Sequence, residues 1–506
     1  MTHYLAITLG PLDRTTATAR RTREIWLASY VFSHLAKCIC DTLPPGTILI
    51  PKHPTQQMGF GVYPDQLIAR FENSTKPDAD FIQKALLQCC NDLGLDSTKA
   101  THYFHVHSVW LSEVQLNEIH LPLESDNASP IHKLKAILQT QDKQNAYHIN
   151  NPEFLDALFS QPHILRKAYD AAQKGSKFRY PSLRRIAAAD QIESMLDLLD
   201  KLDDEEKVSE QELIQLNALK KYHNYVAVLH ADGDYFGKVI SAIGNNREKI
   251  GKFTAYLDQF ASNVAKTIHQ YGGQCIYIGG DDIMCFAPVS NANLNQNIFD
   301  LIQNIRNDFQ KIFSVDPDYQ NVSLSFGLTL TYVKYPMAET IERSRQLMYE
   351  AKNQGGRNAL ALELMLHSGQ TIQTILHFGD ATFENFKTLL KNFDKKEELL
   401  SSLIHSFVQD ESMLKSILQA NAWRERLHHF MHEKFDHQTD KVLFVQAAEE
   451  FICHLKEIYC PATTDSVPIN DQLFTKLLQT LNAVFRIVKF MSESVIVHKT
   501  QISHAE

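Results

Sequence analysis

The first 130 residues alternate between short apolar runs and amphipathic stretches, a pattern that predicts a small domain of strands and helices. Apolar residues recur at helical spacing along 15–43, whereas 4–10 is a compact β-prone run. The expected order is strand, helix, strand, helix, strand, at residues 4–10, 15–43, 46–51, 81–93 and 101–111. This order over residues 1–130 is typical of an α+β domain with one helical layer.

A second α+β unit is predicted for residues 223–366. Its strands are expected at 225–229, 275–278, 283–287, 322–333 and 358–364, and its helices at 235–270, 298–313 and 338–353. Between the second and third strands lie two glycines and two aspartates, Gly279 to Asp282, which predict a tight hairpin turn. The resulting order predicts a palm-like fold with a ferredoxin-like core.

The remaining segments show mainly helical spacing. Residues 131–222 predict a mainly helical linking region, and 367–506, which carry little strand signal, predict a helical bundle. Within the bundle, His428 and His432 are four residues apart, with His429 and His437 nearby. Such spacing is compatible with a metal site, but no cysteine or carboxylate stands at a recognised zinc spacing, which favours exposed histidines.

Composition narrows the classes of function. The chain has 506 residues, enough for three or four domains, and its 44% hydrophobic and 22% charged residues are typical of a globular protein. It has no apolar run of about 20 residues and no signal-peptide pattern at its start, so we expect no membrane association. Eight cysteines without a CxxC pair predict reduced thiols in the cytoplasm and argue against a zinc ribbon. A net charge of −9 argues against a protein that coats nucleic acid on its own.

Two acidic motifs carry the candidate chemistry. The predicted strand at 225–229 runs into Asp232-Gly233-Asp234, and the hairpin turn holds Asp281 and Asp282. If the first strand lies beside the hairpin, Asp232 and the hairpin pair converge on one site. Carboxylate oxygens are ligands for hard divalent cations, and two such ions about 4 Å apart activate an attacking hydroxyl and neutralise a leaving pyrophosphate. The alternative interpretation is a turn and a loop with solvated charges.

Two glycines and two basic residues extend this site. Gly279 and Gly280 permit a positive φ and let a phosphate approach the main chain. Lys352 and Arg357 lie at the end of the predicted helix at 338–353. They either reach the triphosphate of a nucleotide bound at the turn or complement the helix dipole, and both interpretations fit the sequence.

Seven separated segments carry a family resemblance: ITLGPLDRTTATARRTREIWLASY, GVYPDQLIARF, KFRYPSLRRIAAAD, VAVLHADGDYFGKVI, YIGGDDIMCFAPV, LSFGLTLTYVKYPMAETIERSRQLMYEAKNQGGRNALAL and HSGQ. Together they resemble the large subunit of type III CRISPR effector complexes, in the Cmr branch. The resemblance spans nearly the whole chain, in order, so it is far more specific than the acidic turn alone. It implies two palm domains, a linking region and a closing helical domain.

The resemblance implies a metal-dependent nucleotidyltransferase that binds ATP with Mg²⁺ or Mn²⁺ and joins AMP units, commonly into cyclic oligoadenylate second messengers. Some members couple AMP to another small molecule, so a second substrate such as S-adenosylmethionine is also implied. Because pairing of guide RNA with target RNA activates the family, both RNAs and the other subunits of the complex are implied partners. By matching position, the catalytic metal ligands would be Asp232, Asp281 and Asp282. The nucleotide-binding set would be Gly233, Asp234, Gly279, Gly280, Lys352 and Arg357.

Two features depart from the family pattern, and two alternatives stay open. The chain contains no His-Asp dipeptide, so we expect no nuclease activity, and it has no cysteine-rich zinc module. A free-standing diguanylate cyclase is disfavoured because the flanking segments match the CRISPR subunit. A catalytically silent scaffold that caps the guide RNA is disfavoured because it does not need three acidic residues whose mutual repulsion cations must offset.

Overall fold

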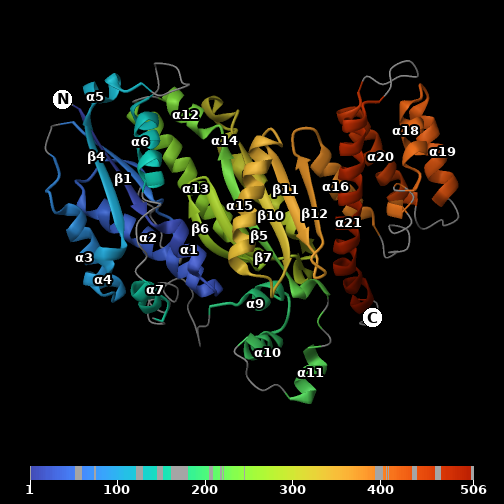
Figure 1. Ribbon diagram of the computed structural model, residues 1–506, viewed down its shortest axis with the longest axis horizontal. Coiled ribbons are helices and arrows are strands. Elements are labelled where there is room, and N and C mark those ends of the chain that lie inside the picture. Colours follow the sequence, from blue (N-terminus) through green and yellow to red (C-terminus); the bar gives the residue numbers. More distant parts are fainter. Residues whose placement is uncertain are drawn as a thin grey trace.

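The computed structural model shows two β-sheets flanked by helices, with a group of C-terminal helices at one end (Figure 1). The α+β class predicted from the sequence is confirmed. Some predicted features lie outside the described residues. They are residues 161–179 of the predicted linking region, residues 394–402 of the predicted bundle, and His437. The structure describes residues 2–51, 60–72, 76–120, 129–144, 152–160, 180–203, 209–216, 219, 221–243, 246–393, 403–405, 407, 409–435, 442–461 and 469–502.

The N-terminal sheet has four antiparallel strands in the order β2-β3-β1-β4. They are β1 (His3–Gly10), β2 (Ile48–Ile50), β3 (Gln66–Phe71) and β4 (His105–Ser112). The helices of this region are α1 (Leu12–Thr18), α2 (Thr22–Thr42), α3 (Phe81–Leu93) and α4 (Ser97–Tyr103). The side chains of β1 and the apolar stripe of α2, including the enclosed Trp26, belong to one core. Hydrophobic burial therefore holds the helices against this sheet.

The structure corrects three details of this region. The helix predicted at 15–43 is two helices, because the Glu24 carboxylate accepts the backbone N–H groups of Arg20 (2.7 Å) and Arg21 (3.2 Å) and starts a new helix at Thr22. Strand β3 adds to the three predicted strands, since its signal lies in long-range pairing with β1. Strand β4 begins at residue 105 because Asp96 caps α4 over the first part of the predicted strand.

The larger sheet has six strands in the order β12-β11-β10-β5-β7-β6, and β10 and β11 run parallel. β5 and β10 are buried along most of their length, as expected for central strands covered on both faces. The strands are β5 (Tyr225–Asp234), β6 (Gln274–Gly279), β7 (Asp282–Pro288), β10 (Ser323–Tyr332), β11 (Ala359–Met365) and β12 (Thr371–His377), with a separate ribbon of β8 (Ser290–Asn291) and β9 (Gln296–Asn297). The helices between them are α12 (Phe236–Ile243), α13 (Arg247–Tyr271), α14 (Ile298–Phe313) and α15 (Met337–Asn353).

Helices account for most of the remaining described chain. Before the larger sheet come α5 (Glu113–Glu118), α6 (Pro130–Gln144), α7 (Pro152–Phe159), α9 (Leu183–Ala187), α10 (Glu193–Asp203) and α11 (Glu210–Leu216). After it come α16 (Thr382–Asn392), α18 (Glu411–Gln419), α19 (Trp423–Phe435), α20 (Val442–Tyr459) and α21 (Asp471–Ile502). Strand β12 corrects the expectation that little strand follows residue 366. It is an edge strand whose inward side chains, Ile372, Thr374 and Leu376, alternate with outward ones.

The two sheets contact each other beside the acidic hairpin. The backbone N–H of Ile278 in β6 donates to the carbonyl of Gly61 (3.0 Å), in the loop before β3. The Arg345 guanidinium of α15 lies 3.1 Å from the Asp13 carboxylate of α1. Buried apolar residues of both sheets form one continuous core. Among the described helices, none combines the length and the hydropathy that crossing a bilayer requires.

Candidate nucleotide and metal site

Strand pairing brings the two acidic motifs together. β5 is antiparallel to β7, with Ala231 opposite Ile283, so Asp232 and Asp282 follow at adjacent ends of the paired strands. β6 and β7 form the predicted hairpin, in which Gly279 pairs with Asp282 across the turn. Asp232, Asp281 and Asp282 therefore converge on one end of the sheet, as expected if the strand lies beside the hairpin.

Two glycines allow this convergence. A Cβ at Gly233 would lie 2.6 Å from Asp281 Oδ2 and 2.3 Å from a ring carbon of Phe236, so glycine lets the Asp281 carboxylate pack against β5. Gly280 has a φ of +78°, the left-handed conformation that the turn requires. Gly279 differs, because a Cβ there would meet its nearest atom at 4.0 Å. An added Cβ would therefore be in ordinary van der Waals contact with Pro64 and Tyr277 and would clash with neither.

The electrostatics of the acidic cluster favour a cation. Two causes, first burial and second the negative charge of Asp232, raise the pKa values of the hairpin carboxyl groups. The pKa of Asp281 rises to about 7, and that of Asp282 rises well above its usual range. The Tyr277 hydroxyl donates a hydrogen bond to Asp282 Oδ2 (2.7 Å), which opposes this rise. Carboxylates that repel one another in a half-buried site are the donor set that Mg²⁺ or Mn²⁺ prefers. These residues fit the metal that the sequence predicts.

Lys352 reaches the acidic cluster directly. Its ammonium lies 2.5 Å from Asp232 Oδ2 and 2.9 Å from the carbonyl oxygen of Gly233. This contact goes beyond complementing the helix dipole, since α15 aims the side chain at the acidic motif of β5. Arg357, with a φ of +71°, stacks its guanidinium 4.9 Å from the Tyr235 ring. Both cations line the same cavity of about 690 Å³ as the three aspartates and Gly233, Gly279 and Gly280.

Asp234 does not reach this cavity. It is fully buried, and its carboxylate accepts hydrogen bonds from the hydroxyls of Ser323 (2.6 Å) and Ser325 (2.8 Å) and from the backbone N–H of Asn358 (3.0 Å). The sequence predicts nucleotide binding for Asp234, and the structure instead places it where it ties β5 to β10 and to the segment after α15. It holds the acidic end of β5 in position.

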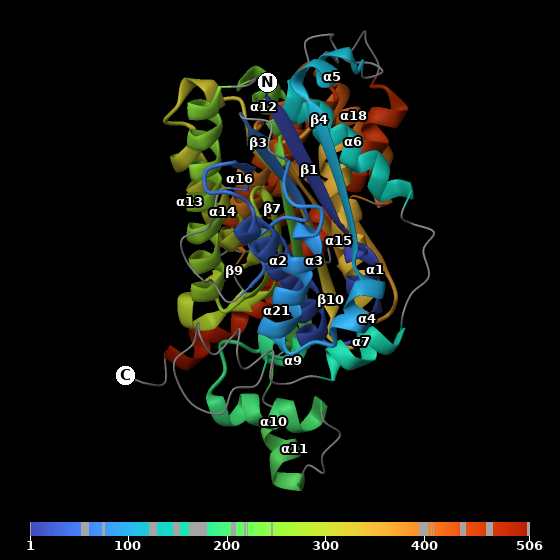
Figure 2. The ribbon, with the colours of Figure 1, turned by 90° about the vertical axis from the view of Figure 1, so that its left-hand side faces the viewer.

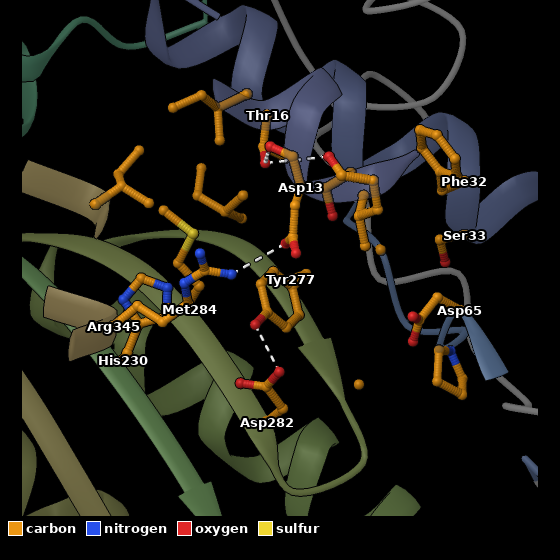
Figure 3. Close-up of a pocket in the computed structure, with 18 of the residues that line it drawn as sticks. Asp13, Thr16, Phe32, Ser33, Asp65, His230, Tyr277, Asp282, Met284 and Arg345 are labelled. Carbon is orange, nitrogen blue, oxygen red and sulfur yellow. Dashed lines mark hydrogen bonds and ion pairs between the residues drawn. The ribbon is translucent and has the colours of Figure 1, made fainter. Parts of the chain in front are cut away.

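A second cavity, of about 370 Å³, lies on the other side of the hairpin, between the two sheets (Figure 3). Asp232, Gly279 and Asp282 line both cavities. Figure 3 shows Asp13 paired with Arg345 and Tyr277 bonded to Asp282 at its wall. The sequence reasoning missed this cavity and its lining residues Asp13, Asp65, Tyr277 and Arg345, because they come from both sheets and meet only through long-range contacts.

The buried His230 stands in the wall of the second cavity. Nδ1 of His230 lies 2.7 Å from the hydroxyl of Ser344, in the middle of α15. Burial, together with the nearby Arg345, lowers the pKa of His230 to about 3. His230 is therefore neutral near pH 7 and adds no positive charge to this cavity.

Comparison with known proteins identifies the fold of this site. The sequence profile described as "Cas10/Cmr2, second palm domain" matches residues 225–361, the segment that carries both acidic motifs. Over this segment the chain is similar to the second palm domain of the Cas10/Cmr2 family. A curated relative, the CRISPR system Cmr subunit Cmr2 of Pyrococcus furiosus, is 29% identical over 194 residues, which are 33% of this chain and 22% of that protein. The aligned part thus spans about a fifth of the Cmr2 relative.

Two solved structures share the fold of this chain over nearly its whole length. The type III-B Cmr-beta complex in its apo state contains a chain with a TM-score of 0.55 and 11% identity, matched over 96% of this chain and 82% of that one. The same complex bound to cognate target RNA gives a TM-score of 0.54 and 11% identity, over 97% and 83%. At this identity the likeness concerns the fold.

Proposed function

We propose that this chain is the nucleotidyltransferase subunit of a type III CRISPR effector complex, and that it converts ATP into an AMP-containing second messenger. The observation that carries the proposal is the convergence of Asp232, Asp281 and Asp282 with Lys352 at one cavity. Cyclic oligoadenylate is the product class that the family resemblance suggests. The partners would be the guide RNA, the target RNA and the other subunits.

In the larger cavity, the acidic residues would bind the metal and the basic residues would bind the triphosphate. Asp232, Asp281 and Asp282 would hold Mg²⁺ or Mn²⁺, which when bound activates the attacking hydroxyl and stabilises the pyrophosphate that leaves. Lys352 and Arg357 line the same cavity and would neutralise the triphosphate. Gly279 lines both cavities and carries no side chain, so a phosphate would approach its main chain there. Lys352 leaves Asp232 when it turns to the phosphates, so its two contacts are alternatives.

The smaller cavity suits the acceptor. It shares Asp232 and Asp282 with the larger one, so a molecule bound there faces the α-phosphate across the acidic hairpin. Its described lining residues include five carboxyl groups and one guanidinium, with the carboxyl groups on Asp13, Asp65, Asp232, Asp282 and Glu342. With Asp232 and Asp282 assigned to the metal, Asp13, Asp65 and Glu342 still outnumber Arg345. This balance favours an acceptor that carries a positive charge, such as S-adenosylmethionine, whereas cyclic oligoadenylate would need ATP as the acceptor.

The test uses the purified complex with its guide RNA. It is incubated with ATP and Mg²⁺ or Mn²⁺, with and without S-adenosylmethionine and matching target RNA, and the products are identified by mass spectrometry. We expect an adenylate product that requires target RNA and disappears in the Asp281→Ala/Asp282→Ala double variant. Asp318→Ala, which removes a carboxylate from an exposed ion pair with Lys249 away from both cavities, is the matched control and keeps the activity.

Two other outcomes would replace this proposal. No product under any condition would favour the scaffold, in which the acidic cluster has no catalytic task. Turnover of GTP without any RNA would favour a stand-alone cyclase.

A further inference from the structure

A cluster of soft and borderline metal ligands lies between two helices of the N-terminal region, away from both cavities. Helices α2 and α3 pack side by side (Figure 2). His34 and Cys38 stand one turn apart on α2, and Cys89 and Asp92 stand three residues apart on α3. Spacings of three and four place each pair on one helix face. The two pairs face each other across the helix contact.

The distances between these side chains match those around a tetrahedral ion. His34 Nε2 lies 3.1 Å from Asp92 Oδ2, and Cys38 Sγ lies 3.9 Å from the same oxygen. With zinc bonds of about 2.0 Å to N or O and about 2.3 Å to S, tetrahedral geometry puts N and O about 3.3 Å apart and S and O about 3.5 Å apart. Each observed distance is within about 0.4 Å of that value.

Cys89 stands beside this group of three, whose ligand atoms lie within 4.8 Å of one another, and would complete it as a fourth ligand. Its thiol interacts with that of Cys38, which lowers the pKa of Cys38 and raises that of Cys89. Both sulfurs are buried, whereas the side chain of His34 is 16% exposed and that of Asp92 38% exposed. The cluster therefore has an enclosed sulfur side and a side through which an ion can enter from solvent.

We propose that His34, Cys38, Cys89 and Asp92 form a structural zinc site that joins α2 to α3. Two thiolates, an imidazole and a carboxylate are ligands that zinc accepts and that Mg²⁺ and Mn²⁺ do not select. Gln88 donates a hydrogen bond to Asp92 Oδ1 (2.7 Å), which leaves Oδ2 directed at the cluster. The site does not depend on the proposed nucleotidyltransferase activity.

A second group of possible zinc ligands lies in the C-terminal helices. His428 and His432 of α19 lie near Glu449 of α20, a carboxylate that the sequence spacing does not reveal. This cluster contains no thiol, and the side chain of His428 is 59% exposed. Thiolate ligands and burial favour the site between α2 and α3 for tight binding.

Zinc content and cobalt spectroscopy of the full-length protein test the proposal. Protein treated with EDTA is titrated with ZnSO₄ against a chromogenic chelator, and bound zinc is counted by mass spectrometry after desalting. We expect one zinc ion per chain. Loss of a partner of a ligand costs about 10–100-fold in metal affinity, so loss of the ligand in Cys38→Ser should weaken binding by at least about 100-fold. Cys40→Ser and Cys90→Ser remove neighbouring buried thiols outside the cluster and are the matched controls, which keep the zinc.

Co²⁺ distinguishes lost ligands from a misfolded variant. Cobalt bound by two thiolates has a sulfur charge-transfer band, which should fall by about half in Cys89→Ser because one of two sulfur ligands is lost. His428→Ala/His432→Ala should leave this band unchanged. Zinc binding that survives Cys38→Ser but is lost in the double histidine variant would overturn the proposal. So would a Cys38–Cys89 disulfide in protein that takes up no zinc after reduction.

Discussion

Replacing Gly233 by alanine tests whether the close approach of Asp281 to β5 builds the acidic site. The added Cβ would lie 2.3 Å from the Phe236 ring and 2.6 Å from Asp281 Oδ2, whereas carbon atoms normally stay about 3.5–4.0 Å apart. The ring would have to move by more than about 1 Å. Phe236 is buried and packs 5.3 Å from Phe253 and 5.6 Å from Phe313, so little free space receives it.

The expected cost follows from this overlap. Overpacking of a filled core costs about 1–3 kcal/mol, and the smaller entropy of unfolded alanine returns about 0.4–1 kcal/mol. We therefore expect Gly233→Ala to lower the free energy of unfolding by about 1–2 kcal/mol. Displacement of the Asp281 carboxylate should also lower adenylate formation by at least about tenfold, since about 1.4 kcal/mol of lost transition-state stabilisation corresponds to tenfold in rate.

The assay combines thermal unfolding with ATP turnover by the assembled complex, and Gly279→Ala is the matched control. At Gly279 the added Cβ meets nothing closer than 4.0 Å, so the melting temperature should stay at the wild-type value. Turnover should still fall there, because the methyl group would cover main chain that lines both cavities. Wild-type stability and turnover in Gly233→Ala would refute the reasoning. A lower melting temperature in Gly279→Ala would show that the hairpin cannot accommodate an added methyl group.

Three further predictions concern single side chains. Because the pKa of Asp281 is raised to about 7, its folded state keeps a proton that the unfolded chain loses near pH 4, so metal-free stability should fall as pH rises from about 4 to 7. Denaturant unfolding at several pH values should show this slope flattened in Asp281→Asn and offset by added Mg²⁺. Asp234→Ala should lower the free energy of unfolding by about 2–4 kcal/mol, because it leaves the buried Ser325 hydroxyl without its acceptor. Urea unfolding measures this loss, and Asp234→Asn should show a smaller one. Tyr277→Phe removes the hydrogen bond that opposes the raised pKa of Asp282, so Mg²⁺ binding followed by calorimetry should require a higher pH, with no change in binding at high pH.

The acidic motifs could be predicted from the sequence because their signals are local. A β-prone run ending in Asp232-Gly233-Asp234 and a glycine turn before Asp282 each specify a strand end, and the pairing of β5 with β7 then brings the carboxylates together. Helix α3 was likewise predicted at 81–93, where an apolar stripe ends at Gly94 in the left-handed conformation. In these places neighbouring residues carry the whole signal.

The rest depends on contacts between distant residues. The helix predicted at 15–43 is interrupted where Glu24 accepts two backbone hydrogen bonds. The apolar spacing on both sides of this point is helical, so the spacing alone does not reveal the interruption. Asp234 lies two residues from Asp232 on the same strand, yet serines of β10 enclose it, which the motif cannot indicate. The smaller cavity exists because the two sheets meet, and Asp13 faces Arg345 across that contact. The domain boundaries and the roles of the site residues stay predictions.

The hydrogen bond from Ile278 to Gly61 makes the acidic turn part of the joint between the two halves of the molecule. Ile278 stands three residues before Asp281, so a force on the N-terminal half acts on the hairpin through its backbone. The Asp13–Arg345 pair is a second fixed point on the other wall of the smaller cavity. The acidic hairpin and the smaller cavity therefore both lie at the contact between the two sheets. A displacement of the N-terminal half would thus reach the acidic hairpin through its own backbone.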